Sequence, residues 1–232
     1  MKQDKIWDYF QGEGVNNYAF VAAWPRLYYL VQLAARLTPK INPTVLNIGT
    51  GNGTLEIECR KRGWKAFSLD PSRVAIQRMY MHGVPGEVGL IESIPFKKES
   101  FNFVFCSEVF EHLTPDQMNT GLIDIKHILK PGGSLLGTVP FNECLESKQT
   151  VCPACGNVFH YVGHQQSFTL PAMREILVRA GMRPVKLFVR SFPDFSRRSP
   201  KGLIKSSVRY ILGVMGEPIA SPHLVFAVQK PS

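Results

Sequence analysis

The stretch Val45–Ile57, VLNIGTGNGTLEI, decides the fold that the sequence predicts. A short apolar run enters a turn that holds Gly49, Gly51 and Gly53, and a pattern typical of a helix follows. Glycines let a ligand lie directly against the backbone, and the start of a helix offers unpaired N–H donors to it. This strand, glycine turn and helix therefore predict a nucleotide-binding site at the edge of a parallel sheet.

Strand and helix patterns alternate on both sides of this turn. Ser72 and Thr114 are expected to cap two of the helices, and Gly132 is expected to follow the end of the second one. Such alternation predicts an α/β fold with a mostly parallel sheet and helices on both faces. The expected strands are TVLNIG (44–49), KAFSLD (65–70), GEVGLI (86–91), FNFVFCS (101–107), GSLLGTVP (133–140), PVKLFVRS (184–191) and HLVFAVQK (223–230).

The composition predicts a folded protein with a basic surface. The 232 residues are 44% hydrophobic and 11% aromatic, which is enough for a core. The formal net charge of +9 favours anionic partners such as nucleic acid, acidic glycans or lipid headgroups, or is simply the charge of a basic globular protein. Neither a membrane-spanning run nor a signal-peptide pattern is present in the sequence, so a cytoplasmic location is expected.

Asp70 ends the second expected strand, about 20 residues after the glycine turn. An acid at this place can accept hydrogen bonds from both hydroxyls of a ribose. The alternative is that Asp70 only caps a helix or closes a turn.

Four segments together resemble the class I S-adenosylmethionine-dependent methyltransferases: VLNIGTGNG (45–53), SLDPS (68–72), ESIPFKKESFNFVFCSEVFEHL (92–113) and ILKPGGSLLGTVP (128–140). The resemblance implies a Rossmann-like sheet whose last strand is antiparallel, and S-adenosylmethionine as the cofactor. The family usually has acids where Asn47 and Leu90 stand here, which are two departures from its pattern. The implied cofactor-binding residues are Asn47, Gly49, Thr50, Gly51, Gly53, Asp70, Pro71, Ile91, Glu92 and Ser107.

Glu108, Glu111 and His112 follow the fourth expected strand, and their spacing would place them on one side of a helical turn. Oxygen and imidazole ligands suit Mg²⁺ or Mn²⁺. The string is similar to the Glu-x-x-Glu-His of small-RNA 2′-O-methyltransferases and ubiquinone-pathway O-methyltransferases, in which a later histidine completes a metal site. His164 stands at the corresponding place. The alternative is that His112 acts as a general base without a metal, or only closes the end of the sheet.

The segment CPACGNVFHYVGH predicts a structural zinc ion. Its Cys-Pro-x-Cys-Gly string is typical of the turns that hold zinc, and Cys152, Cys155, His160 and His164 would supply four ligands. Cys144 could replace a histidine, in which case His164 would face the carboxylates instead. A free or redox-active thiol pair is the other alternative. The whole stretch 141–168 is similar to an insertion that a group of class I methyltransferases shares.

The expected organisation is a helical N-terminal lid (1–43) followed by a methyltransferase domain (44–232). Insertions are expected at about 141–168, with the zinc ligands, and at about 191–221, with basic residues interleaved with apolar ones. The basic segment could meet a phosphate, an acidic glycan or a membrane surface, or pack as a cap on its own domain. Its basic residues are Arg197, Arg198, Lys201, Lys205 and Arg209, and Arg190 stands just before it.

The expected activity is O-methylation of a small-molecule or glycan-type acceptor, assisted by His112 or a metal. The segment after the fourth strand lacks the Asn/Asp-Pro-Pro-Tyr-like turn expected of enzymes that methylate an amino group on a base. It also lacks a suitably placed cysteine nucleophile of the kind expected for methylation of carbon-5 of a pyrimidine. Two alternatives remain: an RNA 2′-O-methyltransferase, although the sequence carries no recognised RNA-binding module, and a non-catalytic cofactor-binding module, which the departures at Asn47 and Leu90 would explain.

Overall fold

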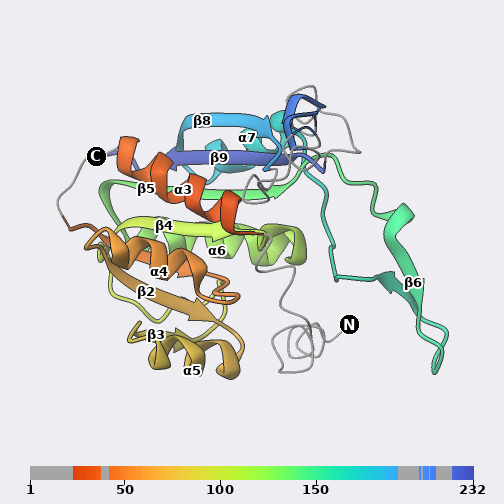
Figure 1. Cartoon of the computed structure of the whole chain (residues 1–232), viewed down its shortest axis with the longest axis horizontal. Coiled ribbons are helices and arrows are strands. Elements are labelled where there is room, and N and C mark those ends of the chain that lie inside the picture. The colour runs from red at the N-terminus through yellow and green to blue at the C-terminus, as the bar shows by residue number, and fades with distance from the viewer. Residues whose placement is uncertain (1–22, 38–41, 193–203, 205, 209, 213–220) are drawn as a thin grey trace.

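The computed structural model describes residues 23–37, 42–192, 204, 206–208, 210–212 and 221–232 (Figure 1). Of the expected N-terminal lid, α3 (Trp24–Leu37) lies within these ranges and residues 1–22 lie outside them. Of the six basic residues named for the basic insertion, Arg190 lies within the described residues and the other five lie outside. No helix among the described residues has both the length and the apolar character needed to cross a bilayer.

A seven-stranded sheet with the order β3-β2-β1-β4-β5-β9-β8 forms the centre of the molecule. All neighbouring strands are parallel except β9, which runs antiparallel to both β5 and β8. The predicted α/β fold with an antiparallel last strand is therefore confirmed. The strands are β1 (Thr44–Ile48), β2 (Lys65–Asp70), β3 (Gly86–Val88), β4 (Phe101–Ser107), β5 (Leu129–Pro140), β8 (Arg183–Arg190) and β9 (His223–Gln229).

Helices pack on both faces of the sheet (Figure 1). The apolar sides of α6 and α7 join one core cluster, and those of α3 and α4 join the other. Cys59 and Cys106 are buried in these cores. The helices after β1 are α4 (Thr54–Lys61), α5 (Arg73–Met81), α6 (Pro115–Ile128) and α7 (Leu170–Arg179).

Both predicted helix caps are present, but one helix ends earlier than expected. The Ser72 hydroxyl accepts the N–H of Ala75, and Thr114 forms a reciprocal capping box with Gln117. Helix α6 ends at Ile128, well before Gly132. Pro131 disfavours helical backbone in the residue before it, so the chain turns into β5.

The insertion leaves the sheet after β5 and returns to it before α7. Its 3₁₀ turn η2 (Glu146–Lys148) leads into a hairpin of β6 (Gln149–Val151) and β7 (Val158–His160), which stands off the body on the right of Figure 1. The returning chain rests on the 3₁₀ turn η1 (Phe110–His112), because the backbone N–H groups of Gln165 and Gln166 both donate to the carbonyl of Glu111. The insertion therefore meets the segment after β4, which lies at the carboxyl edge of the sheet.

Candidate active site

A cavity of about 590 Å³ lies at the carboxyl edge of the sheet, where β1 stands between β2 and β4. The register pairs Ile48 with both Leu69 and Cys106, so the three strands end level with one another. Every predicted cofactor-binding residue except Gly53 lines this cavity, together with Glu108 and His112.

The glycine turn has left-handed backbone angles, and a side chain at Gly49 would have no room. Gly49, Gly51 and Gly53 have φ angles of 80°, 55° and 81°. A Cβ atom at Gly49 would lie 2.6 Å from Cγ2 of Val109. The turn therefore requires glycine for both its backbone angles and its packing, and it presents bare main chain to the cavity.

Asp70 both organises the turn and faces the cavity. Its Oδ2 accepts the N–H of Thr50 and its Oδ1 accepts the N–H of Ser72, each at 2.8 Å. Burial raises the pKa of Asp70, while these two bonds oppose the rise. Each oxygen keeps a lone pair for a further donor. Asp70 thus has the turn role considered as an alternative, and it is also one of the cavity-lining residues.

Glu56 on α4 is a buried acid that the sequence did not single out. Its Oε1 accepts hydrogen bonds from Asn47 Nδ2 (3.0 Å) and Ser68 Oγ (2.9 Å). Its side chain is fully buried, and burial raises its pKa to about 7. The signal that could have identified Glu56 in the sequence is an acid in the first turn of a helix, where apolar residues pack on the sheet. Glu56 therefore stands behind Asn47, at which the related enzymes carry an acid of their own.

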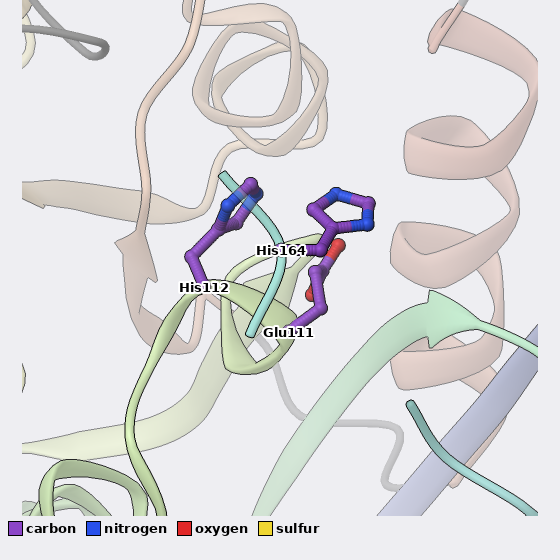
Figure 2. A group of neighbouring side chains, drawn as sticks. All are labelled: Glu111, His112 and His164. Atoms are coloured by element: carbon purple, nitrogen blue, oxygen red, sulfur yellow. The ribbon is translucent and has the colours of Figure 1, made fainter. Parts of the chain in front are cut away.

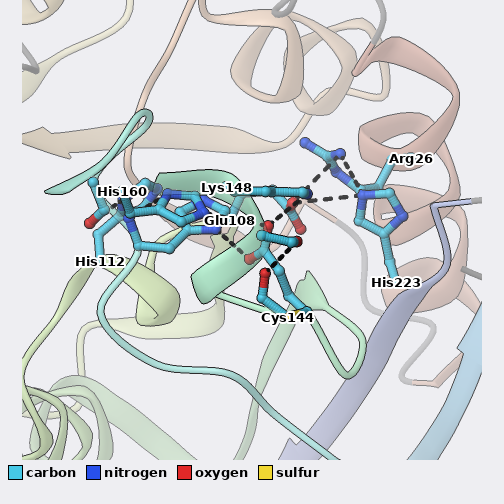
Figure 3. A network of polar contacts seen from close by, with 11 residues as sticks. Arg26, Glu108, His112, Cys144, Lys148, His160 and His223 are labelled. Atoms are coloured by element: carbon cyan, nitrogen blue, oxygen red, sulfur yellow. Dashed lines mark hydrogen bonds and ion pairs between the residues drawn. The ribbon is translucent and has the colours of Figure 1, made fainter. Parts of the chain in front are cut away.

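Glu108 is turned toward α3 and β9 (Figure 3). Its Oε1 accepts Thr138 Oγ1 (2.8 Å), and its Oε2 lies 3.9 Å from Arg26 Nη1 and 3.5 Å from His223 Nε2. Burial alone would raise the pKa of Glu108, but Arg26 and His223 bring it below its ordinary range. The expected helical turn carrying Glu108, Glu111 and His112 is not formed, because Glu108 has a φ of 57° and η1 begins two residues later.

Glu111, His112 and His164 form a cluster where the insertion contacts η1 (Figure 2). One ligand atom from each lies within 4.8 Å of the others. Both oxygens of Glu111 are buried and have no hydrogen-bond partner among the described residues. Burial, and then the nearby charge of Glu108, raise the pKa of Glu111, so a proton or a bound cation is favoured at this carboxylate.

A second group joins His164 to Glu143 and His160. Glu143 Oε2 is hydrogen-bonded to His164 Nδ1, and Glu143 Oε1 accepts Lys148 Nζ at 2.6 Å. The rings of His160 and His164 are stacked with their centroids 4.6 Å apart. Sequence reasoning missed Glu143, because an acid at the start of an irregular segment has no periodic pattern that marks it.

Cys152 and Cys155 lie in the turn between β6 and β7, and neither belongs to either group. The backbone N–H groups of Ala154 and Cys155 lower the pKa of the Cys152 thiol, as in a zinc-binding turn. The structure does not bring this thiol pair together with His160 and His164. Instead, His160 and His164 group with Glu143, and His164 also lies beside Glu111 and His112.

Comparisons with known proteins agree with this fold. A family model described as a methyltransferase domain matches residues 24–187. An uncharacterised methyltransferase of Synechocystis sp. is 30% identical over 92 residues, an alignment that spans 38% of this chain and 43% of that protein. The chain thus spans less than half the length of this curated relative.

Solved structures share the fold at lower identity. A chain from the complex between the Trm112 methyltransferase activator of Haloferax volcanii and a methyltransferase has a TM-score of 0.68 at 19% identity, covering 97% of each chain. A Methanosarcina mazei S-adenosylmethionine-dependent methyltransferase has a TM-score of 0.61 at 14% identity, over 83% of this chain and 94% of that one. A Burkholderia thailandensis N1-methyltransferase with bound S-adenosylhomocysteine has a TM-score of 0.58 at 16% identity, over 93% of this chain and 87% of that one.

Proposed function

The chain belongs to the methyltransferase domain family, and from this premise we propose that it transfers a methyl group from S-adenosylmethionine to an oxygen of a small-molecule or glycan-type acceptor. The observation that carries the proposal is one cavity lined both by the glycine turn with Asp70 and by Glu108 and His112. A reaction between two ligands requires such a shared space, because the reacting atoms must be held in contact.

The residues present fit the cofactor. Gly49 and Gly51 would let it lie against the main chain, and Asp70 would accept its ribose hydroxyls through the lone pairs that the backbone N–H groups leave. Glu56 lies behind Asn47 and, in its ionised form, would supply the negative charge that the family has at position 47. When bound, S-adenosylmethionine supplies an electrophilic methyl group.

His112 is the group in the cavity that can act on an acceptor hydroxyl. Burial lowers its pKa to about 3, so the ring is neutral. The carbonyl of Gly163 lies 3.3 Å from Nδ1 and can only accept, so Nδ1 carries the proton and Nε2 carries the lone pair. This lone pair can accept a hydrogen bond from an acceptor hydroxyl or bind a metal. A divalent ion held by Glu111, His112 and His164 would act as a Lewis acid that lowers the pKa of a hydroxyl.

Calorimetry with S-adenosylhomocysteine tests the first step. The wild-type chain is expected to bind it, and Asp70→Asn is expected to bind at least about tenfold more weakly, because a hydrogen bond to a charged group contributes about 1.5–3 kcal/mol. Asp116→Asn, on the exposed first turn of α6, is the matched control and should bind as wild type. Absence of wild-type binding at millimolar ligand would remove the proposal, and binding without transfer to any acceptor would favour a non-catalytic module.

An RNA 2′-O-methyltransferase is the second candidate. It is supported by the gathering of Glu111, His112 and His164, since the corresponding residues in the resembled small-RNA enzymes hold a metal. The net charge of +9 is compatible with it.

A zinc ion at Cys152 and Cys155 completes the proposal. It is supported by the Cys-Pro-x-Cys-Gly turn and by the N–H groups directed at Cys152. These two thiols are half of a four-ligand site, and the other ligands would have to come from a rearranged insertion or a second chain. Metal analysis should find about one zinc per chain fewer in Cys152→Ser/Cys155→Ser than in wild type. An unchanged zinc content in that variant would mean that these thiols do not bind zinc.

A further inference from the structure

We infer that Glu143 of the insertion is a positioning residue, whose carboxylate holds His164 so that Glu111, His112 and His164 form a two-histidine, one-carboxylate site selective for a divalent transition-metal ion over Mg²⁺. The inference deepens the proposed function, since the metal would serve the same acceptor site. It rests on the hydrogen bonds of four side chains and on the isolation of one buried acid.

Glu111 supplies the observation that requires a ligand. Its side chain is fully buried, and neither of its oxygens has a hydrogen-bond partner among the described residues. Buried polar groups are normally paired, because losing water without a partner costs several kcal/mol for a charged group. Figure 2 shows this carboxylate on the same side of η1 as the two imidazole rings. A bound cation would satisfy both oxygens.

Glu143 determines which nitrogen of His164 is available. The carboxylate of Glu143 accepts a hydrogen bond from His164 Nδ1, so the ring carries its proton there and keeps a lone pair on Nε2. Lys148 donates to the other oxygen of Glu143 at 2.6 Å, which fixes the carboxylate on the side of His164. A carboxylate behind a histidine is the common arrangement for metal-binding histidines, because it sets the tautomer and makes the ligand more basic.

The second group, Glu143 with His160 and His164, supports the site and does not hold the metal. The backbone N–H of His164 donates to His160 Nδ1 at 3.2 Å, so His160 carries its proton on Nε2. That nitrogen lies 3.7 Å from Glu143 Oε1 and has no lone pair to offer. His160 therefore stabilises the negative charge of Glu143, and only the Glu111 group presents metal-binding atoms.

The ligand set decides the class of metal. Glu108 is held by Thr138, Arg26 and His223, so it leaves one carboxylate and two imidazoles for the ion. Mg²⁺ and Mn²⁺ prefer oxygen ligands, whereas imidazole ligands favour Fe²⁺, Co²⁺ or Zn²⁺. Because Glu108 is held elsewhere, the site that the sequence predicts for Mg²⁺ or Mn²⁺ is better suited to these transition-metal ions.

Titration of the chelator-treated chain with Co²⁺ tests the inference, since bound Co²⁺ has a visible absorption spectrum. The titrations use the Cys144→Ser/Cys152→Ser/Cys155→Ser background, so that the thiols of the insertion cannot contribute. We expect one Co²⁺ site that excess Mg²⁺ does not displace, and affinity lowered by about 10- to 100-fold in Glu143→Gln. His164→Ala should lose the site, and Glu143→Asp should recover part of the affinity.

Glu146→Gln is the matched control, because Glu146 is an exposed acid of the same insertion whose carboxylate accepts a hydrogen bond from the Cys144 thiol. It should bind Co²⁺ as the background does. Equal affinity in Glu143→Gln and Glu146→Gln would overturn the positioning role, and displacement by an equal concentration of Mg²⁺ would overturn the metal class.

S-adenosylhomocysteine binding is measured on the same samples. Loss of Co²⁺ binding in Glu143→Gln with unchanged S-adenosylhomocysteine binding supports the inference. Co²⁺ binding in a chain that does not bind S-adenosylhomocysteine would remove the proposed function and leave the metal site standing. A chain that binds S-adenosylhomocysteine but no Co²⁺ would do the reverse.

Discussion

The protonation of Glu56 is coupled to folding. Burial raises its pKa from 4.5 to about 7, in spite of the hydrogen bonds from Asn47 and Ser68. Below pH 4.5 the folded and unfolded chains both hold this proton, and the group costs no stability. As the pH rises from 4.5 through 7, the unfolded chain loses the proton more readily, so stability falls by about 3 kcal/mol in total.

Glu56→Gln should remove this pH dependence. The amide keeps an oxygen for Asn47 and Ser68 but cannot ionise, so the variant should be more stable relative to wild type at pH 8 than at pH 5. Urea unfolding at the two pH values measures the difference. Glu87→Gln, at an exposed position of β3, is the control. An unchanged pH slope in Glu56→Gln would show that the acid is ionised in the folded chain throughout.

Gly49→Ala should destabilise the chain for two separable reasons. A left-handed backbone costs a residue with a side chain about 1–2 kcal/mol, and the new Cβ would press on Val109. In the double variant Gly49→Ala/Val109→Ala, the contact is relieved and only the backbone cost should remain. Urea midpoints of both variants against Val109→Ala separate the two terms. Equal loss with and without Val109 would mean that the contact contributes nothing.

At the scale of elements, the return of the insertion onto η1 assembles the site. Gln165 Nε2 donates to the carbonyl of His112 at 2.6 Å, and Gln166 Nε2 donates to that of Leu113 at 2.8 Å. With the backbone bonds to Glu111, these contacts satisfy the carbonyls at the end of a short 3₁₀ turn. They also bring His164 beside His112, with ring centroids 4.6 Å apart.

Gln165→Ala/Gln166→Ala should loosen this docking without removing a metal ligand. Each lost side-chain bond costs about 1 kcal/mol, so amide hydrogen exchange in residues 161–168 should accelerate while that of β4 stays slow. Gln149→Ala, on the exposed hairpin, is the control. Unchanged exchange in the double variant would mean that the backbone bonds alone hold the segment.

The elements were predictable where local patterns are strong. Strands β2 and β4 have the predicted bounds, and the Thr114 cap begins α6 as expected. The spacing of Glu108, Glu111 and His112 misled, because it assumes a regular helix. Glu108 has a positive φ, and its carboxylate lies beside Arg26 and His223, which belong to elements far away in the chain. Sequence spacing carries no information about such contacts.

At the scale of the whole molecule, the cavity residues near the glycine turn were more predictable from the sequence than the grouping of residues near η1. The glycine turn and Asp70 belong to one strand-turn-helix unit and its neighbour, so their meeting follows from the topology. Glu143 and Glu56 could not be assigned roles, since one acts through an irregular insertion and the other through a contact behind Asn47. The Cys/His pattern grouped four residues, but in the structure Cys152 and Cys155 lie in the hairpin turn, whereas His160 and His164 group with Glu143.

The net charge of +9 gives a prediction that separates the two candidate functions. A chain that contacts 6–10 phosphates of an RNA would lose about 10³–10⁵ in affinity between 50 and 200 mM salt. We expect weak binding of single-stranded RNA with a shallow salt dependence, measured by fluorescence anisotropy. Tight binding with a steep slope would favour the RNA 2′-O-methyltransferase.

The docking of the insertion on η1 also means that the two sides of the cavity depend on different parts of the chain. The glycine turn and Asp70 belong to neighbouring parallel strands, whereas His164 is brought beside His112 only by the insertion between β5 and α7. A chain with a different hairpin in this place should therefore keep the glycine turn and Asp70 in position while the surroundings of His112 change.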